Sequence, residues 1–445
     1  MDHIGVVVSH ADEASERIGA ALREAREWTA HEDASRPPAA GGGTVRRSGA
    51  FELRTFADLH LHLEDVAAAF GGPRFVVFAS RHSGESGPLL TAHFTGNVGQ
   101  APYGGEPGEL ARACPNAARR VLAALDANAP PDYDVGMECT HHGPSRVGAP
   151  SMFVELGSGP EQWADADAAA AVAGAILTLG DVDPTTERTV VGFGGGHYAP
   201  RPTRIVRETD WAVGHVAADW ALSDRTGDDV LLSAFERSDA EYAVVEGDHP
   251  DVRETVAAAD YRVVSETWLR ESVGVPAPLI ERLEAALCPV DEGLRVGARA
   301  ADADPAAPVA TVSLPAALLD EADGVDRDRT RTAVADRTLA YETAEGGTRA
   351  TPRVVAPGGD DGAAAREAIV DALAAVLREK YDDVERTDGA VVARRAAFDP
   401  GAARDRGVPE GPAFGRLAEG ETVTVDGETV RPAEVRRSVV RRFET

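Results

Sequence analysis

Short apolar runs alternate with polar loops and helical segments along this chain. Residues 4–8 (IGVVV), 74–79 (RFVVFA) and 189–193 (TVVGF) are typical of buried strands, while the Ala-rich residues 161–179 predict a helix. Residues 421–430 contain an Asp-Gly pair between alternating polar and apolar positions, which predicts a β-hairpin. Strands that alternate with helices indicate an α/β sandwich built on a mixed sheet.

Several polar loops directly follow predicted strands. They come after residues 74–79, 134–139 and 189–193, and each contains histidine or glycine. In α/β sheets, ligands gather beyond the ends of the strands. We therefore expect these loops to share one site.

The pattern changes near the middle of the chain. Residues 1–285 are expected to form one α/β domain, with a Pro-, Gly- and Ala-rich surface insertion at about residues 30–50. Residues 286–362 include stretches rich in Ala, Asp, Pro and Gly, and are expected to be rich in linkers. Residues 363–445 are expected to form a small α+β C-terminal extension.

The composition shows a large excess of carboxylates. The 445 residues include 74 Asp and Glu against 45 Lys and Arg, for a net charge of −29, and Lys380 is the only lysine. This balance is typical of proteins from salt-loving archaea, whose carboxylate-rich surfaces stay hydrated at high salt; an ordinary acidic cytosolic protein is the alternative. The charge does not exclude RNA as a partner, because high salt already suppresses counterion release.

The cysteines and the N-terminal residues indicate the cellular compartment. Cys114, Cys139 and Cys288 are far apart in sequence and predict no disulfide framework. The first residues lack the pattern of a secretory signal, and no apolar run approaches the roughly 18 residues needed to span a bilayer. We expect a cytoplasmic monomer with no membrane partner.

Three segments combine histidine with glycine. They are residues 138–144 (ECTHHGP), 192–201 (GFGGGHYAPR) and 214–215 (GH). On a strand, His141 and His142 would face opposite ways, so they converge only if the chain turns, and the following Gly-Pro supplies a turn. Clustered imidazoles bind metals or transfer protons near neutral pH, with the nearby glutamate as base or orienter. The alternative is a strand end whose histidines only hydrogen-bond the turn.

The triple glycine of Gly194, Gly195 and Gly196 lets the backbone approach a polar group closely. Its consecutive N–H groups predict an oxyanion or terminal-ribose site. Tyr198 and Arg201 follow closely and are further candidates for substrate binding. A phosphate loop is disfavoured, since the proline-rich sequence after the glycines does not predict a helix. A flexible glycine loop is the alternative.

A second polar loop places a cation, an imidazole and a hydroxyl side by side. Arg81, His82 and Ser83 suit recognition of a carboxylate or a phosphate, although a solvated turn is the alternative. Thr95 and Asn97 follow the next predicted strand and add a weaker signal of the same kind.

Other patterns exclude function classes. The alternating histidines of residues 59–63 (LHLHL) are more typical of a strand with an exposed face than of a metal pair. The chain has no Walker lysine motif and no GxGxxG after a strand, which argues against ATP and dinucleotide cofactors. It has no GxSxG motif, which argues against an ordinary esterase triad.

Taken in order, these motifs resemble those of the archaeal and plant D-aminoacyl-tRNA deacylases. The matching segments are residues 81–83 (RHS), 91–97 (TAHFTGN), 138–144 (ECTHHGP), 153–158 (FVELGS) and 192–200 (GFGGGHYAP). The resemblance covers about residues 1–285 and implies a fold akin to peptidyl-tRNA hydrolases and phosphorylase-like hydrolases. It also implies a bound zinc and hydrolysis of the ester between a D-amino acid and the 3′-terminal ribose of tRNA.

The resemblance leads to an expected mechanism. Zinc held by some of His141, His142, His197 and His215 would acidify water, and Glu138 would take the proton. Backbone N–H groups of the triple glycine would stabilise the oxyanion, and His142 and His197 would take part in catalysis. In a metal-free alternative, His197 or His142 orients water and the tRNA 2′-OH assists. Two rival classes are a small-molecule zinc hydrolase or phosphorylase-like enzyme, and a non-catalytic tRNA-binding protein.

Overall fold

The computed structural model describes residues 3–445, which divide into two compact units. The first unit ends at Val273 and the second begins at Gly274. This boundary precedes the one expected near residue 285, because α11 (Ala277–Ala286) packs against β14 (Val309–Ser313) of the second unit.

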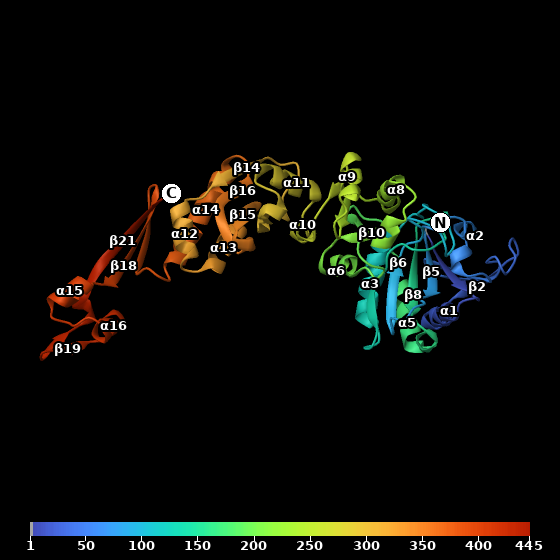
Figure 1. The fold of residues 1–445 in the computed structure, drawn as a ribbon, viewed down its shortest axis with the longest axis horizontal. Coiled ribbons are helices and arrows are strands. Elements are labelled where there is room, and N and C mark those ends of the chain that lie inside the picture. The colour runs from blue at the N-terminus through green and yellow to red at the C-terminus, as the bar shows by residue number, and fades with distance from the viewer. Residues whose placement is uncertain (1–2) are drawn as a thin grey trace. The chain divides into compact units, whose positions relative to one another are not determined.

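The first unit contains an eight-stranded mixed sheet with strand order β2-β3-β4-β1-β5-β8-β6-β7 (Figure 1). Its strands are β1 (Ile4–Ser9), β2 (Thr29–Asp33), β3 (Gly43–Ser48), β4 (Phe51–Phe56), β5 (Phe75–Arg81), β6 (Leu89–His93), β7 (Asp134–Met137) and β8 (Ser151–Gly157). Strands β4, β1, β5 and β8 run parallel, while β6 is antiparallel to β8. The mixed-sheet α/β class predicted from sequence is confirmed. The expected insertion near residues 30–50 contains β2 and β3, which extend one edge of the sheet.

Three long helices are among those that pack against this sheet. They are α1 (Glu13–Ala25), α3 (Pro115–Asn128) and α5 (Ala166–Leu177), which contact β5, β6 and β8, respectively. Helix α1 begins where the Asp12 carboxylate accepts a hydrogen bond from the Ser15 N–H at 3.0 Å, a typical N-cap. The same carboxylate accepts from the Arg81 N–H at 3.0 Å, and it therefore ties α1 to the end of β5.

A second, four-stranded sheet completes the first unit. Its parallel strands are β9 (Thr189–Phe193), β10 (Ala212–Ala217), β11 (Tyr242–Val245) and β12 (Arg262–Val263), in the order β10-β9-β11-β12. Helix α6 (Pro200–Glu208) begins soon after the triple glycine, contrary to the sequence-based expectation. A helix is compatible with this sequence because Pro200 occupies its first turn, where no backbone N–H is needed.

The second unit contains an antiparallel sheet covered by helices. Its strands are β13 (Leu294–Val296), β14, β15 (Ala340–Ala344) and β16 (Arg349–Pro357). Residues of β14, β15 and β16 share a core with α12 (Ala316–Asp323), α13 (Arg327–Ala335) and α14 (Asp360–Leu377). Leu318, Val334, Val354 and Leu373 are fully buried in this core. The residues expected to be rich in linkers are therefore largely folded.

The chain ends in two small sheets. One consists of β17 (Asp383–Thr387), β18 (Ala390–Phe398) and β21 (Arg436–Glu444), and the other of β19 (Val423–Val425) and β20 (Glu428–Val430). The predicted hairpin is confirmed by β19 and β20, whose turn residues Asp426 and Gly427 have φ angles of 49° and 86°. Among residues 3–445, no helix combines the length and the apolar character that crossing a membrane requires.

Candidate active site

The motif-bearing loops of the first unit converge on a cavity of about 400 Å³. Backbone pairing brings two of these loops together, because Glu138 bridges Tyr198 and the Cys139 N–H donates to the His197 carbonyl at 2.9 Å. The cavity lining consists of Asp12, Leu59, His60, Leu61, Ser80, Arg81, His82, Ser83, Tyr103, His141, His142, Glu155 and His197. The expectation that these loops share one site therefore agrees with the structure.

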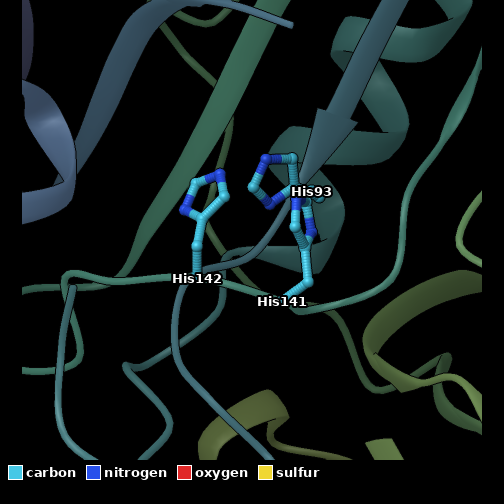
Figure 2. Close-up of side chains that lie close together, drawn as sticks. All are labelled: His93, His141 and His142. Carbon is cyan, nitrogen blue, oxygen red and sulfur yellow. The ribbon is translucent and has the colours of Figure 1, made fainter. Parts of the chain in front are cut away.

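Three histidines form a cluster at the end of β6. His93 is the last residue of β6, and His141 and His142 occupy adjacent positions in the loop after β7. Figure 2 shows the rings of His141 and His142 rising from this loop toward His93. One ring nitrogen from each lies within 4.8 Å of those of the others. These atoms could hold a metal ion.

The hydrogen bonds of the cluster fix which ring nitrogen of each histidine is available. The Nδ1–carbonyl distances are 3.0 Å for His93 to Phe94, 2.8 Å for His141 to Cys139 and 2.8 Å for His142 to Gly143. A carbonyl oxygen only accepts, so each Nδ1 carries the proton, and the Nε2 of a neutral ring presents its lone pair. Metal-binding histidines commonly donate their other ring N–H to a carbonyl in this way.

Burial controls the charge of the cluster. Burial lowers the pKa of His142 to about 3 and, with neighbouring histidines, brings the pKa of His141 well below its usual value. Burial acts in the same direction on His93, but the Glu155 carboxylate 3.6 Å away outweighs it and raises the pKa of His93. Burial also raises the pKa of Glu155 to about 7. His141 and His142 are therefore neutral and able to bind a metal near neutral pH.

Glu138 lies buried between the histidines of the two loops. Its Oε2 is 2.9 Å from Nε2 of His197, and its Oε1 is 3.8 Å from Nε2 of His82. Burial alone would raise the pKa of Glu138, but the His197 hydrogen bond and the nearby imidazoles hold this pKa below its usual range. Within residues 3–445, Oε1 has no hydrogen-bond partner. Glu138 is thus an ionised carboxylate, one oxygen of which is buried without a hydrogen bond from these residues.

His82 connects the loop after β5 to the glycine-bearing loop. Its Nδ1 lies 2.9 Å from Oγ of Ser158, and its Nε2 lies 3.3 Å from the hydroxyl of Tyr198. The Tyr198 hydroxyl also hydrogen-bonds Ser86. Burial lowers the pKa of His82, so its ring is neutral near pH 7. Tyr198 therefore lies at the border of the site.

Arg81 and Ser83 also reach the cavity, as their predicted role in substrate binding requires. The Arg81 guanidinium lies 5.2 Å from the centre of the Trp163 ring, a distance suited to a cation–π contact. The indole N–H of Trp163 donates to the His82 carbonyl at 2.9 Å. This packing holds a cation at the cavity wall.

His215 was expected among the metal ligands, but the structure does not bring it to the cluster. Its ring is 1% exposed, with Nδ1 2.9 Å from the Thr140 hydroxyl and Nε2 2.8 Å from the Ala111 carbonyl. Both nitrogens are therefore engaged within the core. Its hydrogen bond to Thr140 holds the loop that carries the neighbouring pair of histidines.

The expected oxyanion role of the triple glycine does not fit the structure. The Gly194 N–H donates to the Ala217 carbonyl at 2.8 Å, and the Gly195 N–H donates to the Asp219 carboxylate at 3.1 Å. Gly194 has a φ of 94°, and a Cβ there would lie 2.0 Å from the Glu246 carbonyl oxygen. These two glycines therefore allow close packing between loops, and Gly196 leads directly into His197.

Three further candidates make structural contacts away from the cavity. The Thr95 hydroxyl lies 3.3 Å from that of Ser151, and the Asn97 amide donates to the Gly104 carbonyl at 2.9 Å. Arg201 donates to the Val245 carbonyl at 3.2 Å and lies 3.5 Å from Glu266. None of the three belongs to the cavity lining. Their predicted roles in substrate binding have no support from this geometry.

Sequence reasoning missed three residues at the site. His93 and Glu155 lie inside the matching motifs at residues 91–97 and 153–158, but the sequence pattern does not distinguish them from their neighbours. His60 was expected on the exposed face of a strand, whereas it opens a short 3-10 turn (His60–His62) and is buried. Its ring packs edge-on against Phe78, with centroids 5.9 Å apart, so the LHLHL pattern reflects a turn rather than a strand.

Comparisons with known proteins establish the family. Residues 70–264 match the family model described as D-aminoacyl-tRNA deacylase. A curated D-aminoacyl-tRNA deacylase of Natronomonas pharaonis is 54% identical over 99% of this chain and 100% of its own length. The chain belongs to the D-aminoacyl-tRNA deacylase family. The resemblance found in its motifs is thereby confirmed.

Two further curated relatives agree with this chain in length, and one solved structure is similar to part of it. The D-aminoacyl-tRNA deacylases of Halorubrum lacusprofundi and Haloarcula marismortui are 53% and 50% identical over 99% of this chain, covering 96% and 99% of their own lengths. A crystal structure of a conserved protein of unknown function is 29% identical, with a TM-score of 0.56, and covers 61% of this chain and 98% of its own. The relatives confirm the halophilic archaeal origin predicted from composition.

Proposed function

We propose that this protein hydrolyses the ester bond of D-aminoacyl-tRNA and thereby releases free D-amino acid and tRNA. The observation that carries the proposal is the ionised Glu138 carboxylate, buried beside a three-histidine cluster of which His141 and His142 line the cavity, in a member of the D-aminoacyl-tRNA deacylase family. The cluster supplies ligand nitrogens, the carboxylate supplies a proton acceptor, and the cavity admits a substrate. Metal-assisted ester hydrolysis uses these three elements.

The residues present fit a zinc ion. His93, His141 and His142 would hold it through Nε2, since each Nδ1 donates to a backbone carbonyl. The Nε2 of His93 is buried, makes no hydrogen bond among residues 3–445, and lies 3.6 Å from Oε1 of Glu155. Three protein ligands with a fourth position left open are typical of catalytic zinc. When bound, zinc supplies Lewis acidity, which polarises an ester carbonyl and acidifies water.

This ligand set differs from the one expected from sequence. His93 takes the place of His215, whose nitrogens are both engaged elsewhere. His197 donates to Glu138 and acts as a positioning residue in this proposal. The choice of zinc as the metal rests on the three nitrogen donors and on the resemblance of the motifs to those of the family.

The chain's own residues then perform the proton transfer. Oε1 of Glu138 accepts a proton from the water that attacks the ester carbonyl. The hydrogen bond from His197 to Oε2 holds the carboxylate in place while Oε1 accepts this proton. Water adds to the carbonyl carbon, and the bond to the ribose oxygen breaks as that oxygen regains a proton.

The position of the ester in tRNA determines which part of the substrate must enter the cavity. The ester lies at the acceptor end of tRNA, so this end must reach the cavity. We place the reaction in the cytoplasm, where aminoacyl-tRNA is used, and the monomeric state stays a prediction.

The test compares D-tyrosyl-tRNA with D-tyrosine ethyl ester as substrates in molar KCl, before and after treatment with a metal chelator. We expect cleavage of D-tyrosyl-tRNA at far lower concentrations than of the ethyl ester, and loss of cleavage after chelation. Equal use of both esters would favour the rival class of small-molecule hydrolases. Unchanged cleavage after complete removal of metal would contradict the role of zinc.

A further inference from the structure

Two strands of the second unit concentrate positive charge. Strands β18 and β21 pair antiparallel over nine residues each, from Ala390 opposite Glu444 to Phe398 opposite Arg436 (Figure 1). They carry one glutamate and six arginines, namely Arg394, Arg395, Arg436, Arg437, Arg441 and Arg442. This β18–β21 ribbon is therefore positively charged, in a chain whose net charge is −29.

Acidic side chains compensate only half of these arginines. Three ion pairs form, which are Arg394 with Asp383, Arg441 with Glu321, and Arg442 with Glu444. The guanidinium groups of Arg395, Arg436 and Arg437 make no ion pair or hydrogen bond among residues 3–445. Arg395 instead lies 5.7 Å from the centre of the Tyr381 ring, a distance suited to a cation–π contact. Arg436 and Arg437 are exposed to solvent.

The uncompensated arginines are grouped at one end of the ribbon. The strand order β17-β18-β21 leaves β21 at the edge of its sheet, where no further strand among residues 3–445 pairs with it. Neighbouring residues of a strand point to opposite faces, so Arg436 and Arg437 flank this open edge on its two sides. Arg395 lies opposite Val439 and is therefore a diagonal neighbour of Arg437 on the same face.

Protection of the edge strand does not by itself explain the sign of this charge. Charged side chains commonly keep an edge strand from pairing with other chains. Carboxylates would serve that purpose, and they dominate this chain, which has 74 Asp and Glu. Arginines in their place indicate an anionic partner.

High salt limits how such a partner can be held. At molar salt, the Debye length is only about 3 Å, so attraction between distant charges is screened. Binding then depends on direct hydrogen bonds, and the planar guanidinium can form two parallel bonds to one phosphate or carboxylate. An RNA backbone presents a phosphate at every nucleotide and can contact several arginines of one ribbon at once.

We propose that the β18–β21 ribbon binds the phosphate backbone of tRNA through Arg436 and Arg437, with Arg395 beside Arg437. The ribbon lies outside residues 70–264, which match the family model, and it would add affinity for the body of the tRNA without taking part in ester cleavage. The identity of the RNA rests on the proposed function, because tRNA is the RNA that this enzyme would meet with each substrate.

The test measures the dissociation constant of uncharged tRNA for the full chain by fluorescence anisotropy, over a series of KCl concentrations. Arg436→Gln combined with Arg437→Gln removes two exposed guanidinium groups that have no protein partner to lose. We expect this glutamine variant to bind tRNA about 10-fold or more weakly, since a hydrogen bond to a charged group contributes at least about this factor. The slope of log affinity against log KCl concentration should become shallower by about two, one for each lost phosphate contact.

Two further variants separate the ribbon from the net charge of the chain. Arg378→Gln combined with Arg416→Gln removes the same charge from exposed positions elsewhere in the second unit, and should bind tRNA like wild type. Arg436→Lys combined with Arg437→Lys should keep the salt dependence but only part of the affinity, because an ammonium group cannot form the two-pronged contact.

Equal tRNA affinity of wild type and the glutamine variant, or equal weakening by the Arg378 and Arg416 control, would overturn the proposal. Binding of polyglutamate that the glutamine variant loses, with tRNA binding unchanged, would also overturn it and assign the ribbon to an acidic protein. If the glutamine variant binds tRNA weakly as expected but wild type does not cleave D-tyrosyl-tRNA, the proposed function fails while the ribbon's role stands. A raised KM for D-tyrosyl-tRNA with unchanged kcat would support both.

Discussion

Oε2 of Glu138 lies 2.9 Å from Nε2 of His197, whereas Oε1 of the same carboxylate has no hydrogen-bond partner among residues 3–445. One oxygen is thus held by a hydrogen bond, and the other makes none with these residues. This asymmetry gives the two residues different roles in our account: Glu138 accepts a proton, and His197 positions it.

Glu138→Gln tests the first of these roles. Glutamine keeps the shape of the side chain and can still accept from His197, but its amide is a far weaker proton acceptor. We expect kcat for D-tyrosyl-tRNA to fall by about 10²–10⁴-fold, as for the loss of other general bases. The matched control is Glu254→Gln on the exposed surface of α9 (Pro250–Ala258), which should retain wild-type kcat. A Glu138→Gln enzyme with near-normal kcat would remove Glu138 from the mechanism.

His93→Ala tests the proposed zinc ligands without relying on activity. Removing one of three nitrogen ligands should raise the dissociation constant for zinc by more than about 10-fold, since even loss of an outer-shell partner costs this much. Competition with a chromogenic chelator measures this constant. The control is His31→Ala, at an exposed position of β2, which should bind zinc like wild type. Equal zinc affinity in the two variants would exclude His93 from the ligand set.

His215→Ala separates a structural histidine from a ligand. The substitution leaves the Ala111 carbonyl and the Thr140 hydroxyl without their buried partner. We expect the free energy of unfolding, measured by denaturant titration in molar KCl, to fall by about 1–3 kcal/mol. The stoichiometry of bound zinc in the folded variant should stay at the wild-type value. Loss of zinc with unchanged stability would restore His215 as a ligand.

The buried histidines also predict how stability depends on pH. Burial lowers the pKa of both His60 and His215 to about 4, whereas an unfolded histidine titrates near 6.5. As the pH falls from 6.5 toward 4, the unfolded chain therefore binds protons that the folded chain excludes. The free energy of unfolding of the metal-free protein should decrease over this window.

Denaturant titrations of the metal-free protein at pH 7, 6 and 5 measure this decrease. The His215→Ala variant should lose less stability than wild type between pH 7 and pH 5, because it lacks one of the buried histidines whose pKa folding lowers. The comparison cancels the contribution of the carboxylates, which both proteins share. Identical pH dependence of the free energy of unfolding in the two proteins would contradict the lowered pKa of His215.

The sequence predicted the location of the site better than its ligands. The motifs identified the loops, because histidine and glycine concentrate there, but pairing between loops depends on the whole fold. His93 could have been identified from the two-residue period of its strand, because it lies on the same strand face as Thr91 of the motif at residues 91–97. His60 could not, because a period of two over five residues is compatible with either a strand or a short turn.

The fold was predictable where apolar runs were long and uninterrupted. The strand around Val76 and Val77 is buried on both faces and was evident from its sequence. The core of the second unit escaped detection because its members, such as Leu318 and Val334, are spread among Ala-, Asp- and Arg-rich helices. Composition there indicated linkers, although tertiary packing buries the few large side chains.

The measurement that tests the central claim most directly is a parallel assay of D-tyrosyl-tRNA and L-tyrosyl-tRNA in molar KCl. It follows the release of labelled tyrosine from the same tRNA by the zinc-loaded enzyme. Our account predicts rapid release of D-tyrosine, with the L-ester cleaved no faster than without enzyme. Cleavage of neither ester, or equal cleavage of both, would contradict it.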